Sequence, residues 1–555
     1  MATAATTPDS TVPSEQADSW IPMIVIAMGQ MLMSFNVAAL PVSMGGMVAS
    51  FDTPPTTVGS AIVMYSLGVS GFIMLGGKLG QRFGSKLFFQ GAVGLFLAAM
   101  ILMVVSPTAE VMLVAQGLAG LAGAALVPTL VVLIANHYRG KQQAQAVGWL
   151  GSARAIAGVL AFVIVGFLAS ISWRLAFALL IAHAGAIMYL SFKLKPSAEN
   201  PAVKIDIVGV ILSAVGIILI TFGFNNLRNW GLLVASSAAP FDLAGVSPAP
   251  LMILAGMLIL GGFLYWTHQG MLTGGTPLLS LEVIDAPREW AAAICLFVIV
   301  GTEAAINFSV PLYIQIVQGN SSMATSVAMM PFMLTVFFTA ILVVRLYGKF
   351  TPRTIALAAF ALVAVGTLWL AFVASNDWSV FPVILGLVTV GIGQGALVTL
   401  LFNVLVTSAP HELAADVGSL RGVTQNLAAA VGTALMGTLL VGVLQILIDR
   451  ELLDNPVISS EFKVASQFDL NSVNFIHNDQ LQERLADTKA TPAKVEEAVR
   501  INTNSRLRAL KIGFVMLSML SLVAMIPCAW LPDYRPGEIP AGPDPSDAIS
   551  ESRAT

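Results

Sequence analysis

The chain has 555 residues, of which 57% are hydrophobic and only 10% are charged, and its net charge is −3. A soluble protein carries about 25% charged residues, so this composition excludes a soluble fold. The slightly negative net charge also excludes the basic footprint of a nucleic-acid-binding protein. We therefore expect a protein that lives in a lipid bilayer and has no nucleic-acid partner.

The first segment, 1–19, is polar and contains acidic residues but no Lys or Arg. A cleavable signal peptide needs a basic start ahead of its apolar stretch. We therefore expect 1–19 to be a disordered cytoplasmic tail, with the first retained span opening at Trp20.

Fourteen apolar runs follow, and each is long enough for the roughly 20 residues that cross a bilayer as a helix. They lie near 21–42, 57–76, 87–105, 109–135, 144–170, 174–192, 205–224, 249–267, 290–313, 323–346, 354–374, 380–407, 418–446 and 509–531. We expect an all-α membrane protein with an N-terminal six-helix bundle at 20–195 and a C-terminal one at 290–531. Two extra spans and their loops would occupy 196–289.

Lys and Arg in the short loops indicate the orientation, because such residues favour the cytoplasmic side. If the N-terminus is cytoplasmic, the inward loops hold most of these residues, Arg421 among them, and the short outward loops hold only Arg174 and Arg228. The pattern predicts a multi-pass membrane protein with both termini cytoplasmic, and we expect its membrane to be a bacterial inner membrane.

One polar segment, 449–508, is too long for a turn and is expected to be a periplasmic loop able to meet a partner there. Thr491 and Pro492 resemble an N-cap followed by proline at the first helical position, so a helix is expected to begin there and run into the last span. The stretch 532–555 is Pro-rich and acidic, which is typical of a disordered tail, here a cytoplasmic one.

Two charged residues are predicted deep inside spans, Arg154 in the fifth and Glu303 in the ninth. An ionisable group inside the bilayer costs several kcal/mol unless it is paired or hydrated, and it usually marks a transport pathway. Asn307 and Gln315 continue from Glu303 at multiples of four residues. Such polar stripes indicate either a hydrated path or hydrogen bonds that hold helices together.

Two further amides belong to similar stripes, Asn403 in the twelfth span and Gln30 in the first. For these residues, too, both a hydrated path and hydrogen bonds between helices remain open as interpretations. Together with Gln116 of the fourth span, they complete the polar groups that we expect to face substrate or protons.

The run from Gly77 to Lys86 reads GKLGQRFGSK. It resembles the cytoplasmic loop signature of the major facilitator superfamily, and Gly77, Arg82, Gly84 and Lys86 occupy its glycine and basic positions. Three other stretches, 38–41, 311–315 and 391–395, resemble the fourteen-span drug:proton antiporter branch of that superfamily. The resemblance implies two bundles that work by alternating access as a secondary transporter. It also implies efflux of amphipathic drug-like or toxic compounds, driven by the proton gradient.

Several positions depart from the branch pattern. Gln81 stands at the acidic position of the loop signature, Leu32 at the usual aspartate of the first span, and Gln116 at the usual arginine of the fourth. These departures argue against family-style proton coupling through the N-terminal bundle. They leave Glu303 as the carboxylate for coupling or substrate binding, with Arg154 as its partner or gate.

The sequence shows no phosphate-binding loop, and His411-Glu412 lacks the second histidine of a metalloprotease motif. Cys295 and Cys528 fit neither a metal site nor a disulfide framework. We expect no cofactor, no metal and no enzymatic activity. Two alternative functions remain open: export of a specific anionic metabolite or lipid, and a non-transporting receptor or assembly partner that uses the outer loop.

Overall fold

The structure is a computed structural model that describes residues 19–533 apart from 139, 197–198, 200, 202–203, 237–238, 274–276, 285, 377–379, 409–413, 456–480 and 483–490. The two predicted tails, apart from residues 19, 532 and 533, and most of the predicted loop 449–508 therefore lie outside the described residues. The described residues form helices and no β-strand, with only isolated bridges near Val234 and Val246. The predicted all-helical fold is confirmed.

The first half of the chain forms α1 (Ile21–Val42), α2 (Met44–Phe51), α3 (Pro55–Phe83), α4 (Ser85–Val105), α5 (Ala109–His137), α6 (Gly140–Ile171), α7 (Trp173–Ser191), α8 (Ile207–Trp230) and α9 (Pro248–Leu272). The second half forms η1 (Leu281–Ile284), α10 (Pro287–Leu312), η2 (Tyr313–Val317), α11 (Ser322–Leu342), η3 (Val343–Gly348), α12 (Pro352–Val373), α13 (Val380–Ser408), α14 (Ala414–Asp454), α17 (Pro492–Val523) and η6 (Pro527–Trp530).

Among the described residues, 13 helices are long and apolar enough to cross a membrane. The remaining predicted span, 144–170, coincides with α6, a helix of 32 residues whose described apolar part is Ile156–Ile171. Long apolar helices satisfy the backbone polar groups internally, which is what a bilayer demands of any segment that crosses it. The chain is therefore a multi-pass membrane protein.

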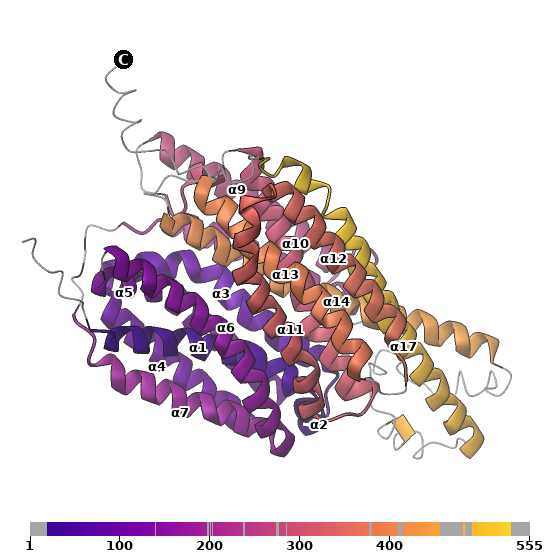
Figure 1. The fold of residues 1–555 in the computed structure, drawn as a ribbon. Helices are drawn as coiled ribbons and strands as arrows, with labels where there is room; N and C mark the ends of the chain where they lie inside the picture. The colour runs from indigo at the N-terminus through magenta and orange to yellow at the C-terminus, as the bar shows by residue number, and fades with distance from the viewer. Residues whose placement is uncertain are drawn as a thin grey trace, which may run out of the picture.

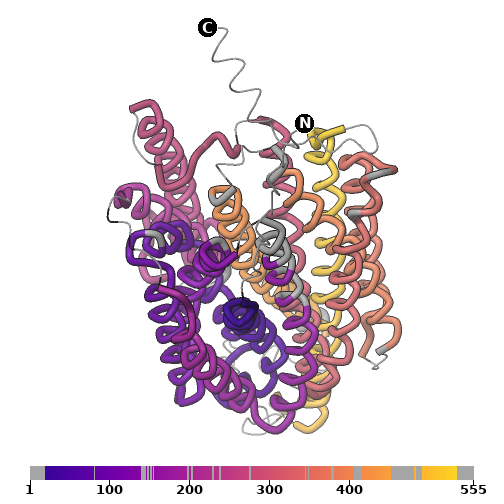
Figure 2. Tube along the Cα trace, turned by 60° about the vertical axis from the view of Figure 1, so that its left-hand side comes forward, coloured from indigo at the N-terminus to yellow at the C-terminus, as the bar shows by residue number. Residues whose placement is uncertain are grey.

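The helices gather into two groups that meet along the middle of the molecule. α1 and α3 to α7 lie on one side, and α10 to α17 lie on the other (Figure 1 and Figure 2). The two groups touch chiefly where α3 packs on α14 and where α6 packs on α11. α8 packs against α9, α3 and α14, so it covers one seam between the groups, while α9 lies outside it.

Three segments differ from the sequence predictions. The resemblance implies a cytoplasmic loop over Gly77–Lys86, and this extent is wrong, because α3 continues to Phe83 and the turn into α4 is Gly84 alone, at a φ of 83° that favours glycine. The polar segment 449–508 is partly helical, since α14 runs on to Asp454 and α17 begins at Pro492 as predicted. Arg421 lies within α14, not in a loop.

Two basic side chains cap the C-terminal ends of helices, one at each end of the bundle. At the end that holds Gly84, here called the motif end, Lys86 Nζ donates to the carbonyls of Phe192 (3.0 Å) and Leu194 (2.6 Å), just past α7. At the opposite end, Arg174 donates to the carbonyls of Val104 (3.1 Å) and Ser106 (3.0 Å), at the end of α4. Cations favour helix C-termini because unpaired carbonyls and the helix dipole make that end negative.

Glycines bring α3 and α5 close enough for their backbones to touch. A Cβ added to Gly120 would meet the carbonyl oxygen of Tyr65, and one added to Gly76 would meet the carbonyl of Ala124. Contacts of this kind are typical of membrane helices, where small residues allow tight packing. The α3–α5 pair therefore forms a rigid wall beside the middle of the molecule.

We expect Gly120→Ala to lower the unfolding free energy by about 1–3 kcal/mol, because the added methyl group overpacks this contact. The measurement is the thermal unfolding midpoint of purified protein in detergent. Gly185→Ala in α7 is the matched control, because a Cβ there meets nothing within 4 Å. Since alanine is the better helix former, the control should unfold at the wild-type temperature or slightly above it. Equal midpoints for the two variants would contradict this account of the packing.

Candidate functional site

A cavity of about 280 Å³ lies between the two groups of helices. Its wall is built mainly by α1, α3, α6, α10 and α14. The polar side chains that line it are Gln30, Ser34, Tyr65, Ser66, Glu303, Asn307, Gln425 and Asn426. The remaining wall is apolar and includes Met33, Val37 and Phe162. Pockets of this composition, apolar with a few convergent polar groups, are typical of small-molecule sites.

Glu303 carries the charge of this cavity, and no other described lining residue is ionisable at neutral pH. It lies in the middle of α10, a helix of 26 residues, and is half-buried. Gln394 of α13 donates from Nε2 to Glu303 Oε2 at 2.6 Å, while the Oε1 of Gln394 is buried and has no hydrogen-bond partner within the described structure. The carboxylate is therefore hydrogen-bonded to an amide of α13 and also borders the cavity.

Asn307 lies one turn after Glu303 on α10 and lines the same cavity. Its side-chain oxygen is buried and finds no hydrogen-bond partner among the described residues. A buried amide oxygen without a partner costs about 1–3 kcal/mol, so it is a strong acceptor for water or for a ligand group. Gln30 faces the same space from α1.

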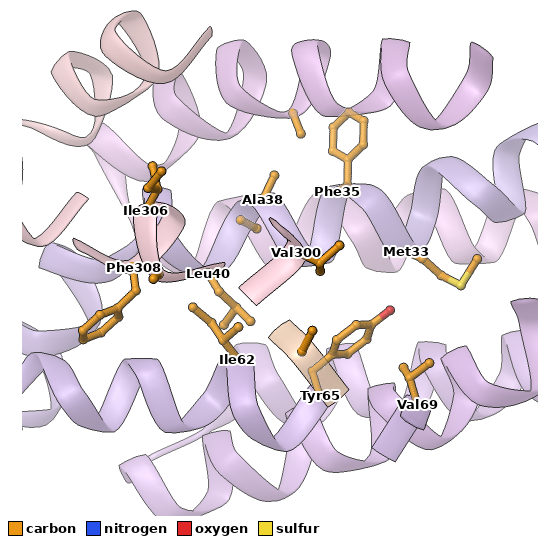
Figure 3. Packing of buried hydrophobic residues seen from close by; sticks show 14 of the residues in the cluster. Met33, Phe35, Ala38, Leu40, Ile62, Tyr65, Val69, Val300, Ile306 and Phe308 are labelled. Carbon is orange, nitrogen blue, oxygen red and sulfur yellow. The ribbon is translucent and has the colours of Figure 1, made fainter. Parts of the chain in front are cut away.

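Figure 3 shows the apolar side chains that surround this region. Met33, Phe35 and Leu40 project from α1, Tyr65 and Val69 project from α3, and Val300 and Phe308 come from α10 (Figure 3). Gln30, Glu303 and Asn307 were predicted from the sequence as site residues, and the structure brings all three to one cavity.

Arg154 lies on α6, four residues before Gly158 and eight before Phe162, and both of those line the cavity. Residues four apart share a helix face, so the position of Arg154 belongs to the face that borders the cavity. Its side chain is not among those that the structure describes. The predicted pairing with Glu303 therefore stays a prediction.

Gln315 does not line the cavity. It lies in η2, a π-helical turn that follows α10, and its Nε2 donates to the carbonyl of Pro41 at 3.0 Å. The backbone N–H of Gly45 donates to its Oε1 at 2.7 Å. Gln315 thus joins the end of α10 to the break between α1 and α2 at the opposite end. We call this contact the Gln315 latch.

Two other predicted site amides lie away from the cavity. Gln116 of α5 exchanges hydrogen bonds with Asn36 of α1, at 3.0 and 3.3 Å, and both side chains are fully buried. This reciprocal pair holds two helices together, which is the packing alternative left open for such residues. Asn403 lies near the end of α13 beside Tyr347. Of the loop-motif residues, Gly84 forms the α3–α4 turn, Gly77 and Arg82 lie in α3, and Lys86 lies in α4. None of the four lines the cavity.

Sequence reasoning missed the contacts of three residues. Gln394 lies in the stretch 391–395 that resembles the antiporter branch, but nothing in the sequence links it to Glu303, 91 positions away. Arg421 packs its guanidinium 3.9 Å from the centre of the Phe402 ring, one turn from the cavity residue Gln425. Arg506 is fully buried in α17, on a face shared with Asn502. The sequence predicted that this helix begins at Pro492, ahead of its apolar run, but not that Asn502 and Arg506 are buried within it.

The described residues contain no group of three or more His, Cys, Asp or Glu placed to hold a metal ion. Cys295 and Cys528 lie 3.7 Å apart, sulfur to sulfur, as buried free thiols. The site is thus a cavity with one described carboxylate and several amides, which can bind a small molecule or exchange a proton.

Solved structures share this architecture. A bacterial homologue of the human lysosomal transporter Spinster, crystallised in an inward-facing conformation, superposes with a TM-score of 0.60 at 14% identity, over 93% of this chain and 98% of that one. An autoinhibited peptide transporter of the POT family superposes with a TM-score of 0.57 at 15% identity, over 95% of this chain and 98% of that one. At such low identity these likenesses show the fold alone.

Sequence relatives agree with the fold. A Streptomyces coelicolor protein named as an actinorhodin transporter is 25% identical over 77% of this chain and 74% of its own length. A Yersinia pestis protein named as the multidrug resistance protein MdtD is 26% identical over 74% of this chain and 85% of its own length. The family model of the Major Facilitator Superfamily matches residues 26–433. The superfamily predicted from the loop motif is confirmed, and this chain is a transporter of the Major Facilitator Superfamily.

Proposed function

We propose that the protein exports amphipathic, lipophilic compounds across the inner membrane in exchange for protons. The observation that carries the proposal is the Glu303 cavity, a largely apolar space of about 280 Å³ with a carboxylate at its wall. The names of the relatives, a multidrug resistance protein and an actinorhodin transporter, support export of small molecules.

Glu303 is the group through which protons and substrate would be exchanged. A proton and a cationic substrate both neutralise the same carboxylate, so binding of one disfavours binding of the other, which is what exchange requires. The neighbouring Gln394 suits both states. Its N–H donates to the ionised carboxylate, and after an amide flip its carbonyl could accept from the protonated acid.

The orientation proposed from the sequence places the motif end in the cytoplasm. Lys78, Arg82 and Lys86 all lie there, at the end of α3 and the start of α4. Basic residues near short connections are retained on the cytoplasmic side. The Gln315 latch then belongs to the periplasmic side, where it would close the cavity in the conformation seen here.

We expect Glu303→Gln to abolish proton-linked export, because the amide keeps the shape of the side chain but cannot take up or release a proton. The measurement is efflux of the cationic dye ethidium with simultaneous pH recording in inverted vesicles. Glu110→Gln, an exposed acid in the first turn of α5, is the matched control and should keep wild-type flux.

Three outcomes of this experiment differ in meaning. Loss of both flux and proton movement in Glu303→Gln alone supports the proposal. Unchanged proton-linked flux in that variant would eliminate Glu303 as the coupling group. Absence of dye flux in the wild type would contradict drug export and favour a specific anionic metabolite or lipid as substrate.

We also expect Gln315→Leu to open the opposite end of the cavity more often. The variant loses two neutral hydrogen bonds worth about 0.5–1.5 kcal/mol each, so the open population should rise about tenfold. The measurement is the labelling rate of Ser34→Cys, in the cavity wall, by a membrane-impermeant maleimide in right-side-out vesicles.

The control for the latch is Gln318→Leu. Gln318 lies three residues further on, but its amide donates to Tyr313 and Ser375 within the C-terminal group of helices. It should leave the labelling rate near that of Ser34→Cys alone. Equal acceleration by both variants would indicate general loosening and would contradict a latch function for Gln315.

A further inference from the structure

A second cavity, of about 330 Å³, lies where α8 covers the seam between α3 and α14. We call it the α8 pocket. Fifteen described residues line it, among them Gly59, Ser60, Phe222, Asn225, Phe308 and Thr433. It shares none of these residues with the Glu303 cavity. The two cavities are therefore distinct, although α3, α10 and α14 contribute to the walls of both.

The α8 pocket is polar but carries no charge on any described lining residue. Seven of its 15 described lining residues carry a hydroxyl or an amide. Ser60 donates to the side-chain oxygen of Asn225 at 3.3 Å, which ties α3 to α8 across the pocket. An ion would leave its hydration shell here without meeting a described counter-charge, a transfer that is strongly unfavourable. The pocket therefore suits an uncharged ligand that can both donate and accept hydrogen bonds.

Thr433 supplies an unused hydrogen-bonding group. Its side chain is 2% exposed, and its hydroxyl oxygen has no hydrogen-bond partner in the described part of the chain. A buried hydroxyl left in this way costs about 1–3 kcal/mol, which a ligand oxygen or N–H in the pocket would recover.

Aromatic and aliphatic side chains form the rest of the wall. Phe222 of α8 is 40% exposed at the rim, whereas Phe308 of α10 is fully buried. Rings of this kind pack well against a flat ligand face. The combination of aromatic walls with hydroxyl and amide groups suits a ring system that bears hydroxyl or carbonyl oxygens.

Phe308 separates the α8 pocket from the Glu303 cavity. It directly follows Asn307, which lines the other space. The Phe308 ring packs against Gly59 of α3, where an added Cβ would lie 2.8 Å from it, and near Gly437 of α14. Figure 3 shows Phe308 beyond Leu40 and Ile306, at the far side of the cluster from Met33.

We propose that the α8 pocket is a second ligand site, which binds the uncharged, hydroxyl- or carbonyl-bearing ring of an amphipathic compound independently of Glu303. α8 thereby becomes a wall of a binding site and not only a cover for the seam. The place of this site in transport rests on the proposed export function, whereas its occupancy by a ligand does not.

The test is equilibrium binding to the full-length protein in lipid nanodiscs, with empty nanodiscs subtracted. The probes are dihydroxyanthraquinone, an uncharged ring with hydroxyl and carbonyl oxygens, and ethidium, a cation. We expect Thr433→Val, which keeps the shape of the side chain and removes its hydroxyl, to weaken dihydroxyanthraquinone binding about three- to tenfold. Asn225→Leu, on the other wall, should weaken it similarly and serves as the second variant should the first not fold.

Thr221→Val is the matched control. Thr221 lies on α8, is fully buried and, like Thr433, has a hydroxyl without a hydrogen-bond partner among the described residues, but it lines neither cavity. It should leave both affinities within about twofold, the size of a weak hydrogen-bond effect. The loss in Thr433→Val should be confined to dihydroxyanthraquinone.

Two results would overturn the proposal: unchanged dihydroxyanthraquinone affinity in both pocket variants, or an equal loss in Thr221→Val. Failure of the proposed export function would look different. It would appear as absent proton-linked ethidium efflux, with the effect of Thr433→Val on dihydroxyanthraquinone binding still present.

Discussion

A polar group inside the hydrocarbon layer has to find its partner within the protein, because no water is present to supply one. Much of this structure follows from that constraint. Lys86 and Arg174 donate hydrogen bonds to backbone carbonyls at helix ends, and Gln116 and Asn36 hydrogen-bond to each other. Two of the polar groups that depart from the rule, the side-chain oxygen of Asn307 and the hydroxyl of Thr433, border a cavity, whereas others such as the hydroxyl of Thr221 do not. An unpartnered group therefore indicates a place for a ligand or water only where it also borders a cavity.

The Gln116–Asn36 pair also bears on how the two halves of the molecule divide their work. The family pattern that this chain resembles has an arginine at the position of Gln116, and such a group would need a charged or strongly polar partner in the bilayer. Here two neutral amides exchange hydrogen bonds with each other. The neutral pair supports the proposal that charge chemistry has moved to the C-terminal half, where Glu303 and its amide neighbour Gln394 lie.

Much of this arrangement could be predicted from the sequence, and the reason is the length and periodicity of apolar helices. The apolar run near 290–313 predicts a span, and Glu303 and Asn307, four residues apart, are predicted to share one face of it. Both side chains line the cavity. Gln315 does not, because residues four apart drift about 40° on a helix of 3.6 residues per turn. Over three such steps the stripe turns away, and the π-helical turn at Tyr313–Val317 changes its direction again.

Other features depend on contacts between distant segments, for which the sequence holds no local signal. The hydrogen bond from Gln394 to Glu303 joins residues 91 positions apart, and that from Ser60 to Asn225 joins residues 165 positions apart. The α8 pocket was invisible for the same reason, since α3, α8 and α14 each supply ordinary Thr, Ser and Asn residues. Only their meeting at one seam turns them into a site.

The Gln315 latch has an evolutionary consequence because its two sides are chemically unequal. Gln315 contributes a side chain, whereas the other side contributes the backbone carbonyl of Pro41 and the backbone N–H of Gly45. Backbone groups persist through side-chain substitution, so the latch is exposed to mutation at Gln315 and at Gly45, where a Cβ would lie 2.9 Å from the Gln315 oxygen. The side chains of α1 that line the neighbouring cavity take no part in these two hydrogen bonds. Substitutions among them could therefore change which compounds bind while the Gln315 latch is retained.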